Sequence, residues 1–126
     1  MTEKLLHIKT YSLALAIICV YKEIISKHKE FVLSKQLLRA ATAPGALVRE
    51  AEFAQSKADF ISKLSIALKE ANETNYWTSL LHDSAYISDE TFKDLKDKID
   101  EIVRILVSSI KTLKLKEEQI KSHKRK

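Results

Sequence analysis

The sequence predicts an all-α protein, an antiparallel up-down four-helix bundle, and three observations support this. The 126 residues are enough for one domain. The composition, 45% apolar and 31% charged, provides side chains both for a hydrophobic core and for a solvated surface. Glycine and proline occur once each, too rarely for the many turns of an all-β fold. Apolar residues recur at helical spacing in four segments. We place the bundle in residues 1–115 and expect residues 116–126 to form a basic, frayed or disordered tail.

The first expected helix, about Leu5–Lys27, is apolar around much of its circumference. Its stretch Thr10–Tyr21 carries no charge and follows Lys4 and Lys9, as a secretory signal would. It is shorter than the roughly 20 residues that cross a bilayer, and bulky side chains replace a cleavage site. We therefore expect a buried helix in a cytoplasmic protein without a membrane partner. The single cysteine, Cys19, excludes an internal disulfide, and we expect an inert core thiol.

The second helix is expected to begin near Leu33 or Ser34, after a polar cluster at residues 26–30 that ends or bends the first. It contains the adjacent Pro44 and Gly45. Proline disfavours the helical conformation of the preceding residue and lacks a backbone donor, so we expect a kink or a break there. The third helix is expected to start at Ser56, with Asp59 three residues later in an arrangement like a capping box.

The fourth helix has the clearest start, with Ser88 as its N-cap and Ile87 placed to pack on Phe92. Its apolar seam alternates spacings of three and four and is interrupted once, by a serine. The seam consists of Phe92, Leu95, Ile99, Ile102, Leu106, Ser109 and Leu113. The apolar faces of the first and fourth helices are wider than a small bundle needs internally, so we expect a homo-oligomer.

The positive charge of the chain is concentrated at its C-terminal end. From residue 111 onward there are seven basic and two acidic residues, whereas residues 1–110 carry 15 of each. The basic residues of this end are Lys111, Lys114, Lys116, Lys121, Lys124, Arg125 and Lys126. Such a tail can bind phosphates without reading their sequence. The alternative, a solvated helix end that keeps the protein soluble, is the commoner situation at a terminus.

Residue patterns typical of catalysis or metal binding are missing from the sequence. None of the four histidines has an acidic residue three positions earlier, which is the spacing of helical di-iron ligands. One glycine cannot build a P-loop or a dinucleotide-binding turn. Glu70 and Glu73 lie one helical turn apart. A solvated face or a structural ion pair, with Lys69 alongside and Arg39 available from the second helix, is a better interpretation than acid–base catalysis. Of the adjacent Tyr76 and Trp77, one should lie in the core and the other at an edge. We expect no catalytic residue, no cofactor and no metal ion.

The stretch Phe31–Leu81 resembles the bacterial four-helix bundle family named for proteins encoded in 23S rRNA intervening sequences. The resemblance is carried by QLLRAATAPGALVREAEFA, by SKADFISKLSIALKEANET and by the following YW. The first helix and the heptad-like fourth helix also suit that family. The chain departs from many members at residues 46–48, where it reads Ala-Leu-Val in place of a polar Asn.

This resemblance implies an up-down bundle that assembles as a ring-like homopentamer and has no catalytic activity. A related branch, the accessory proteins of diversity-generating retroelements, consists of basic bundles that work with a reverse transcriptase and its RNA. RNA or a nucleoprotein is therefore an implied partner. The family's polar positions fall on Arg39, Glu50, Ser56, Lys57, Glu70 and Glu73. We interpret them as interhelical or intersubunit pairs. For Arg39 and Lys57, contact with RNA is the more specific alternative.

Two functions are therefore expected. The first is a non-enzymatic homo-oligomeric bundle that binds RNA or a nucleoprotein weakly, mainly through residues 111–126. The second is a protein-interaction scaffold without affinity for nucleic acid, in which the same residues are merely solvated. A bundle enzyme or metalloprotein would require stoichiometric iron or zinc.

Overall fold

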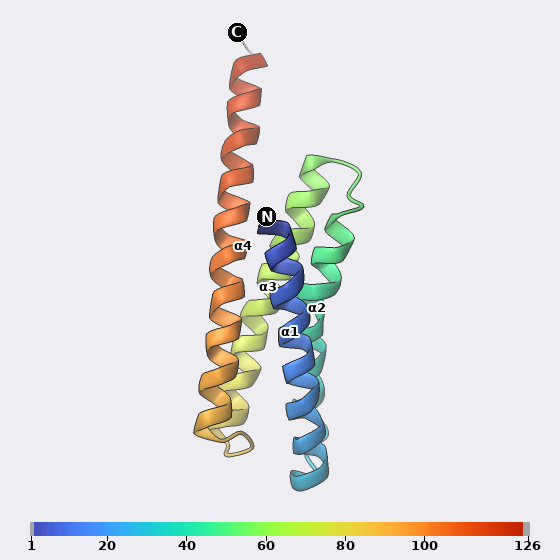
Figure 1. Cartoon of the computed structure of the whole chain (residues 1–126), viewed down its shortest axis with the longest axis vertical. Coiled ribbons are helices and arrows are strands. Elements are labelled where there is room, and N and C mark those ends of the chain that lie inside the picture. Colours follow the sequence, from blue (N-terminus) through green and yellow to red (C-terminus); the bar gives the residue numbers. More distant parts are fainter. Residues whose placement is uncertain (1, 125–126) are drawn as a thin grey trace.

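The computed structural model describes residues 2–124, and over that range it contains helices and short connections but no strand (Figure 1). The helices are α1 (Thr2–Glu23), the π-helical turn η1 (Ile24–His28), α2 (Leu33–Ala51), α3 (Lys57–Asp83) and α4 (Asp89–Lys124). Both α1 and α3 pack against α2 and against α4, which makes a four-membered bundle. The predicted all-α class and the four helices are confirmed.

Figure 1 shows the chain passing back and forth along the long axis of the molecule, so each helix begins where the preceding one stopped. We call one end the head; it contains the start of α3 and the C-terminal part of α4. The other end, the foot, contains η1 and the connection between α3 and α4 at residues 84–88.

The core is a continuous cluster of aliphatic side chains from all four helices. In α4 the centre of the predicted seam is buried, with Ile99, Ile102 and Leu106 all 0% exposed. The seam residues Phe92 and Leu113 are partly buried and pack against the same cluster. Each fully buried aliphatic side chain of this kind stabilises the fold by roughly 1.5–3 kcal/mol. The heptad-like spacing therefore identified the inward face of α4 correctly.

At the foot, α1 ends through a π-helical turn and α2 starts with a cap. After Ile24–His28, Lys29 takes a left-handed conformation with φ 54°, so the polar cluster ends the first helix. The Glu30 carboxylate then accepts backbone N–H groups of residues 32, 33 and 34 at 3.0, 2.9 and 2.7 Å. Burial raises the pKa of Glu30, but these hydrogen bonds outweigh it and hold the pKa below its ordinary value.

Of the kink or break expected at Pro44, the break does not occur: α2 runs uninterrupted from Leu33 to Ala51. Pro44 is itself buried, and α2 packs on both α1 and α3, so tertiary contacts offset the missing backbone hydrogen bond. Gly45 faces α1, where a Cβ added to it would lie 3.5 Å from Thr10 Oγ1. The Thr10 hydroxyl donates to the carbonyl of Leu6 in its own helix at 2.6 Å. Small residues thus line the contact between α1 and α2.

The predicted starts of α3 and α4 are confirmed. Ser56 Oγ accepts the N–H of Asp59 at 3.0 Å, and the Asp59 carboxylate accepts the N–H of Gln55 at 3.1 Å. Ser88 Oγ accepts the N–H of Thr91 at 3.2 Å. Each cap satisfies amide groups that a helix N-terminus would otherwise leave unpaired.

The structure describes α4 as helical through Lys124, well beyond residue 116, where we expected fraying or disorder to begin. Arg125 and Lys126 lie outside the described residues. Leu115 and Ile120 are 51% and 41% exposed, so packing contributes little to this end of α4. Its lysines and glutamates are good helix formers, which accounts for the continued helix.

Cys19 is exposed, and the expectation of a core thiol was wrong. It lies on the outward side of α1, whose apolar side chains Leu5, Ile8, Tyr11 and Leu15 are 42–62% exposed. We call these four residues with Cys19 the α1 face. A charge-free stretch cannot distinguish the two sides of an apolar helix, and packing on α2 and α4 buries only the other one. No helix within residues 2–124 is both long and apolar enough to cross a membrane.

Candidate nucleic-acid interface

The structure brings two of the predicted basic residues together at the head. Lys57 is the first residue of α3, and Lys116 lies on the part of α4 that passes it. Together with Ile120 and His123, they line a shallow cavity of about 500 Å³. Both lysines are exposed. Residues far apart in the sequence thus contribute to one basic surface.

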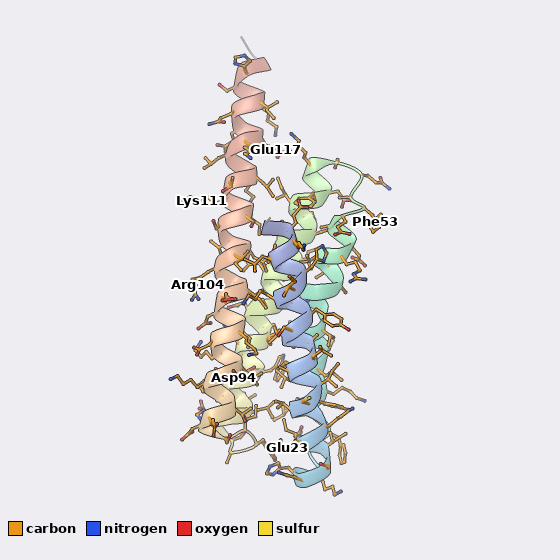
Figure 2. The ribbon with its side chains drawn as sticks, in the orientation of Figure 1. Glu23, Phe53, Asp94, Arg104, Lys111 and Glu117 are labelled. Atoms are coloured by element: carbon orange, nitrogen blue, oxygen red, sulfur yellow. The ribbon has the colours of Figure 1, made fainter. Side chains whose placement is uncertain are left out.

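The other predicted lysines of α4 lie on more than one side of the helix. Lys111 and Lys114 line a separate shallow cavity beside Leu68 of α3 and Val107. Figure 2 shows Lys111 and Glu117 on the stretch of α4 that extends toward the head. The side chain of Lys124 is not among those described, and Arg125 and Lys126 lie outside the described residues.

The head lysines are not neutralised within the bundle. In the part of the chain that the structure describes, Lys57, Lys111, Lys114, Lys116 and Lys121 are exposed, and none lies within 4 Å of a carboxylate. Each therefore keeps its charge available to an external anion. Salt weakens such exposed electrostatic contacts, because the Debye length is only about 8 Å at physiological ionic strength.

Arg39 is separated from this basic surface and is held by carboxylates. Its Nη1–H donates to Glu70 at 3.2 Å, a second nitrogen contacts Glu73, and its Nε–H donates to Gln36 at 3.3 Å. The indole N–H of Trp77 donates to Glu73 at 3.0 Å. This bond, with the charge of Arg39, holds the pKa of Glu73 below its ordinary value although burial opposes the shift. The guanidinium is already engaged, so Arg39 is a poor phosphate ligand.

The remaining predicted polar positions are separate from one another. Ser56 is the N-cap of α3, as described above. Glu50 is exposed, and within the described residues its side chain makes no hydrogen bond or ion pair. Tyr76 is 60% exposed while Trp77 is partly buried against the core, which is the division expected of these neighbours. The two rings meet edge to face at 5.0 Å.

A polar cluster at the foot was missed by sequence reasoning. His82, near the end of α3, lies 2.6 Å from an oxygen of Asp89 and 3.2 Å from one of Asp83, and its ring stacks on Phe92. The bond to Asp89, the first residue of α4, raises the pKa of His82; Asp83 adds to this and burial opposes it. Asp89 follows His82 by seven residues across a turn, so a ligand spacing of three residues before the histidine does not include it.

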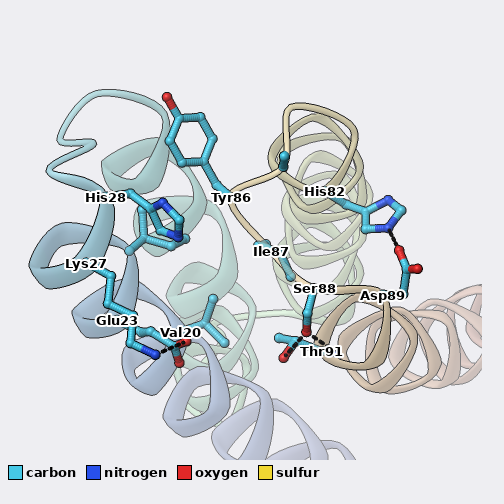
Figure 3. Close-up of a pocket in the computed structure, with 12 residues that line it drawn as sticks. Val20, Glu23, Lys27, His28, His82, Tyr86, Ile87, Ser88, Asp89 and Thr91 are labelled. Carbon is cyan, nitrogen blue, oxygen red and sulfur yellow. Dashed lines mark hydrogen bonds and ion pairs between the residues drawn. The ribbon is translucent and has the colours of Figure 1, made fainter.

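The foot also contains a cavity of about 540 Å³ between η1 and the connection from α3 to α4 (Figure 3). Figure 3 shows His28 beside Tyr86 on one side, while His82 points toward Asp89 on the other. The His28 and Tyr86 rings meet edge to face at 5.4 Å. Within the described residues, no group of three histidine, cysteine or acidic side chains is arranged to hold a metal ion.

A family model described as 23S rRNA-intervening sequence protein matches residues 6–108. The chain belongs to this family. The matched range stops before Lys111, so the basic end of α4 lies outside it. Among curated proteins, none matches the chain.

A solved structure supports the same assignment. The chain is similar to a crystal structure of a protein of unknown function from the S23 ribosomal protein family of Bacteroides thetaiotaomicron VPI-5482. The two sequences are 48% identical, the match covers 88% of this chain and 99% of the other, and the TM-score is 0.86. The resemblance in residues 31–81 is therefore confirmed at the level of the family and the fold.

Proposed function

We propose that this intervening-sequence family protein is a cytoplasmic, non-enzymatic, oligomeric scaffold whose basic head binds RNA or a nucleoprotein weakly. The observation that carries the proposal is the charge distribution. Residues 1–110 contain equal numbers of basic and acidic residues, whereas the head carries the exposed lysines Lys57, Lys111, Lys114, Lys116 and Lys121 without carboxylate partners among the described residues. Such a surface binds polyanions by releasing counterions.

The head is suited to the RNA backbone more than to its bases. Tyr76 and Trp77, which could stack on bases, lie beside the acidic side chain of Glu73. The head lysines project from several sides of an exposed helix instead of lining one deep groove. Contacts of this kind supply affinity without sequence specificity.

The α1 face supports self-association of the up-down bundle into a ring-like homo-oligomer. The family resemblance favours a pentamer. Four large apolar side chains on one helix face are each at least 42% exposed. A contiguous apolar surface of this kind is typical of a protein–protein interface. Light scattering at micromolar concentration should detect an oligomer, and Ile8→Glu should reduce its mass while far-ultraviolet circular dichroism stays unchanged. A monomeric wild-type protein would contradict this part of the proposal.

A scaffold without nucleic-acid affinity is the second candidate function. It is favoured by the ion pairs of Arg39 with Glu70 and Glu73. Arg39 was one of the two residues expected to contact RNA, and its positive charge is already neutralised within the chain. Under this alternative, the head lysines serve only solubility.

A salt titration of binding to a single-stranded 20-nucleotide RNA separates the two functions. The test variant replaces Lys111, Lys114, Lys116 and Lys121 by Gln, and the matched control replaces four exposed foot lysines, Lys22, Lys27, Lys29 and Lys35. Each lost phosphate contact should lower the slope of log K against log salt by about 0.7, so the head variant should show a shallower slope. The foot variant should keep the wild-type slope. If the wild-type protein does not bind at low salt, the scaffold without RNA affinity replaces this proposal.

A further inference from the structure

At the head, an open groove lies between α1, α3 and α4. Figure 1 shows the N-terminus of α1 well short of the C-terminal end of α4. The groove forms a cavity of about 520 Å³ whose apolar lining includes Leu6, Phe60, Leu64, Ile105 and Leu113. These side chains come from α1, α3 and α4.

The groove continues along α4 into the shallow head cavity. The two cavities share Lys116, and the second adds Ile120 and His123. From Ile105 to His123, at 1.5 Å per helical residue, the combined surface runs for about 27 Å. A helix of about 18 residues has the same length. An elongated and open shape suits a helix laid along α4 better than a compact ligand.

Ser109 supplies a polar atom inside this groove. It interrupts the apolar seam of α4, and its Oγ is buried without a hydrogen-bond partner in the described part of the chain. A buried hydroxyl without a partner is destabilising, so Ser109 marks an imperfectly packed place beneath the groove.

The charges around the groove are mainly positive. Arg104 and Lys116 line it, and Lys57 lines its continuation, against the single acidic residue Glu3. A second copy of this chain offers no excess of acidic residues on its α1 face, because the exposed charges are Glu3 and Lys4 at one end and Lys22 and Glu23 at the other, so it does not complement this positive charge. RNA is also a poor occupant, because it has no apolar side chains to pack against the apolar lining of the groove.

We propose that this head groove binds an acidic amphipathic helix of a partner protein. Apolar side chains at positions i, i+3, i+4 and i+7 of the partner would cover the partly buried Phe60, Ile105 and Leu113, and its carboxylates would meet Arg104 and Lys116. The assignment names a partner for the scaffold and does not depend on RNA binding.

The test uses the full chain and two designed 18-residue peptides labelled for fluorescence anisotropy. Both carry Leu at the i, i+3, i+4 and i+7 positions, one with Glu and the other with Lys at the remaining positions. The acidic peptide should bind at micromolar concentration, and the basic peptide should bind at least about tenfold more weakly. Lys116→Glu should reduce this preference.

Two further variants locate the site. Ile120→Glu, at a residue that is 41% exposed, should weaken binding of the acidic peptide by at least about tenfold without unfolding the bundle. Val107→Glu is the matched control, because Val107 is 47% exposed on α4 but lines the other shallow cavity. It should leave peptide binding unchanged.

Several outcomes would overturn the proposal. Equal binding of the two peptides, no binding of either, or equal effects of Ile120→Glu and Val107→Glu would each do so. A change in oligomer mass caused by Ile120→Glu would instead identify a second copy as the occupant. If RNA binding fails while the acidic peptide binds as described, the proposed RNA function is wrong and the groove assignment stands.

Discussion

Charged side chains that connect elements at the foot are paired within the chain, whereas the lysines that line the head cavity are not. At the foot, Glu30 caps α2, His82 pairs with Asp89 across the connection from α3 to α4, and Lys27 pairs with Glu23 at 3.1 Å. At the head, Lys57 and Lys116 are exposed and lie beyond 4 Å from any carboxylate in the described residues. Charges satisfied within the chain contribute to folding, and charges left unsatisfied remain available for binding. The difference predicts that foot substitutions change stability and head substitutions change affinity.

The largest effect should come from the buried seam that joins the two ends. Leu106→Ala removes a side chain that is 0% exposed and should lower the free energy of unfolding by about 2–5 kcal/mol. Leu115→Ala, on the same helix but 51% exposed, should change it by less than about 0.5 kcal/mol. Urea denaturation measures both, and similar losses would show that the head end of α4 is packed in solution.

The next effect concerns the cap at the foot. Glu30→Ala leaves three backbone amides of α2 without their acceptor and should cost about 0.5–2 kcal/mol. Because the folded-state pKa of Glu30 lies below its ordinary value of 4.5, its stabilisation is present above about that pH and is lost as pH falls through the folded pKa.

Denaturation of wild type and Glu30→Ala between pH 7 and pH 3 tests this pH dependence. The difference between the two proteins should shrink at the acidic end. Glu23→Ala is the matched control at an exposed foot carboxylate and should change stability by only about 0.3–0.5 kcal/mol. A pH-independent difference for Glu30→Ala would contradict the capping role.

A smaller effect is expected for the pair between α2 and α3. Glu70→Gln weakens the ion pair with Arg39, whose side chain is 50% exposed, so the loss should be about 0.2–1 kcal/mol. Thermal unfolding and light scattering are the measurements. An unchanged melting temperature together with an unchanged oligomer mass would contradict a structural role for Glu70.

The smallest expected effect belongs to His82. Its folded-state pKa is raised by Asp89, so the stabilisation is present below the ordinary value of 6.5 and is lost as pH rises through the folded pKa. Asp89→Asn should lower the pKa of His82 in a nuclear magnetic resonance titration and flatten this part of the stability profile. An unchanged titration midpoint of His82 in the Asp89→Asn variant would show that Asp89 does not stabilise the protonated imidazole.

Local patterns predicted local structure well. The caps at Ser56 and Ser88 and the seam around Ile102 were found from spacing alone, because each depends on residues within a few turns of one helix. The family resemblance also came from contiguous stretches. The cap supplied by Glu30 was missed, because glutamate at that position depends on the left-handed Lys29 that precedes it.

Features that depend on neighbouring helices were not predictable in the same way. The exposure of Cys19, the continuity of α2 through Pro44 and the bond from His82 to Asp89 are decided by which faces meet and how a connection turns. Of the basic residues expected to contact RNA, Lys57 lines the same head cavity as Lys116, whereas Arg39 forms ion pairs with Glu70 and Glu73. Charge type is visible in a sequence, but the partner of a charge is not.

The amino-acid sequence by itself determined the helical class, the starts of α3 and α4, the inward face of α4 and the family. These depend on periodicity and short-range hydrogen bonds, whose partners are a fixed number of residues apart. Only the tertiary structure decided which side of α1 is covered, which basic residues remain unpaired, and that α1, α3 and α4 together line an open groove. Each of these follows from the relative lengths and positions of packed helices, and those are properties of the assembled bundle.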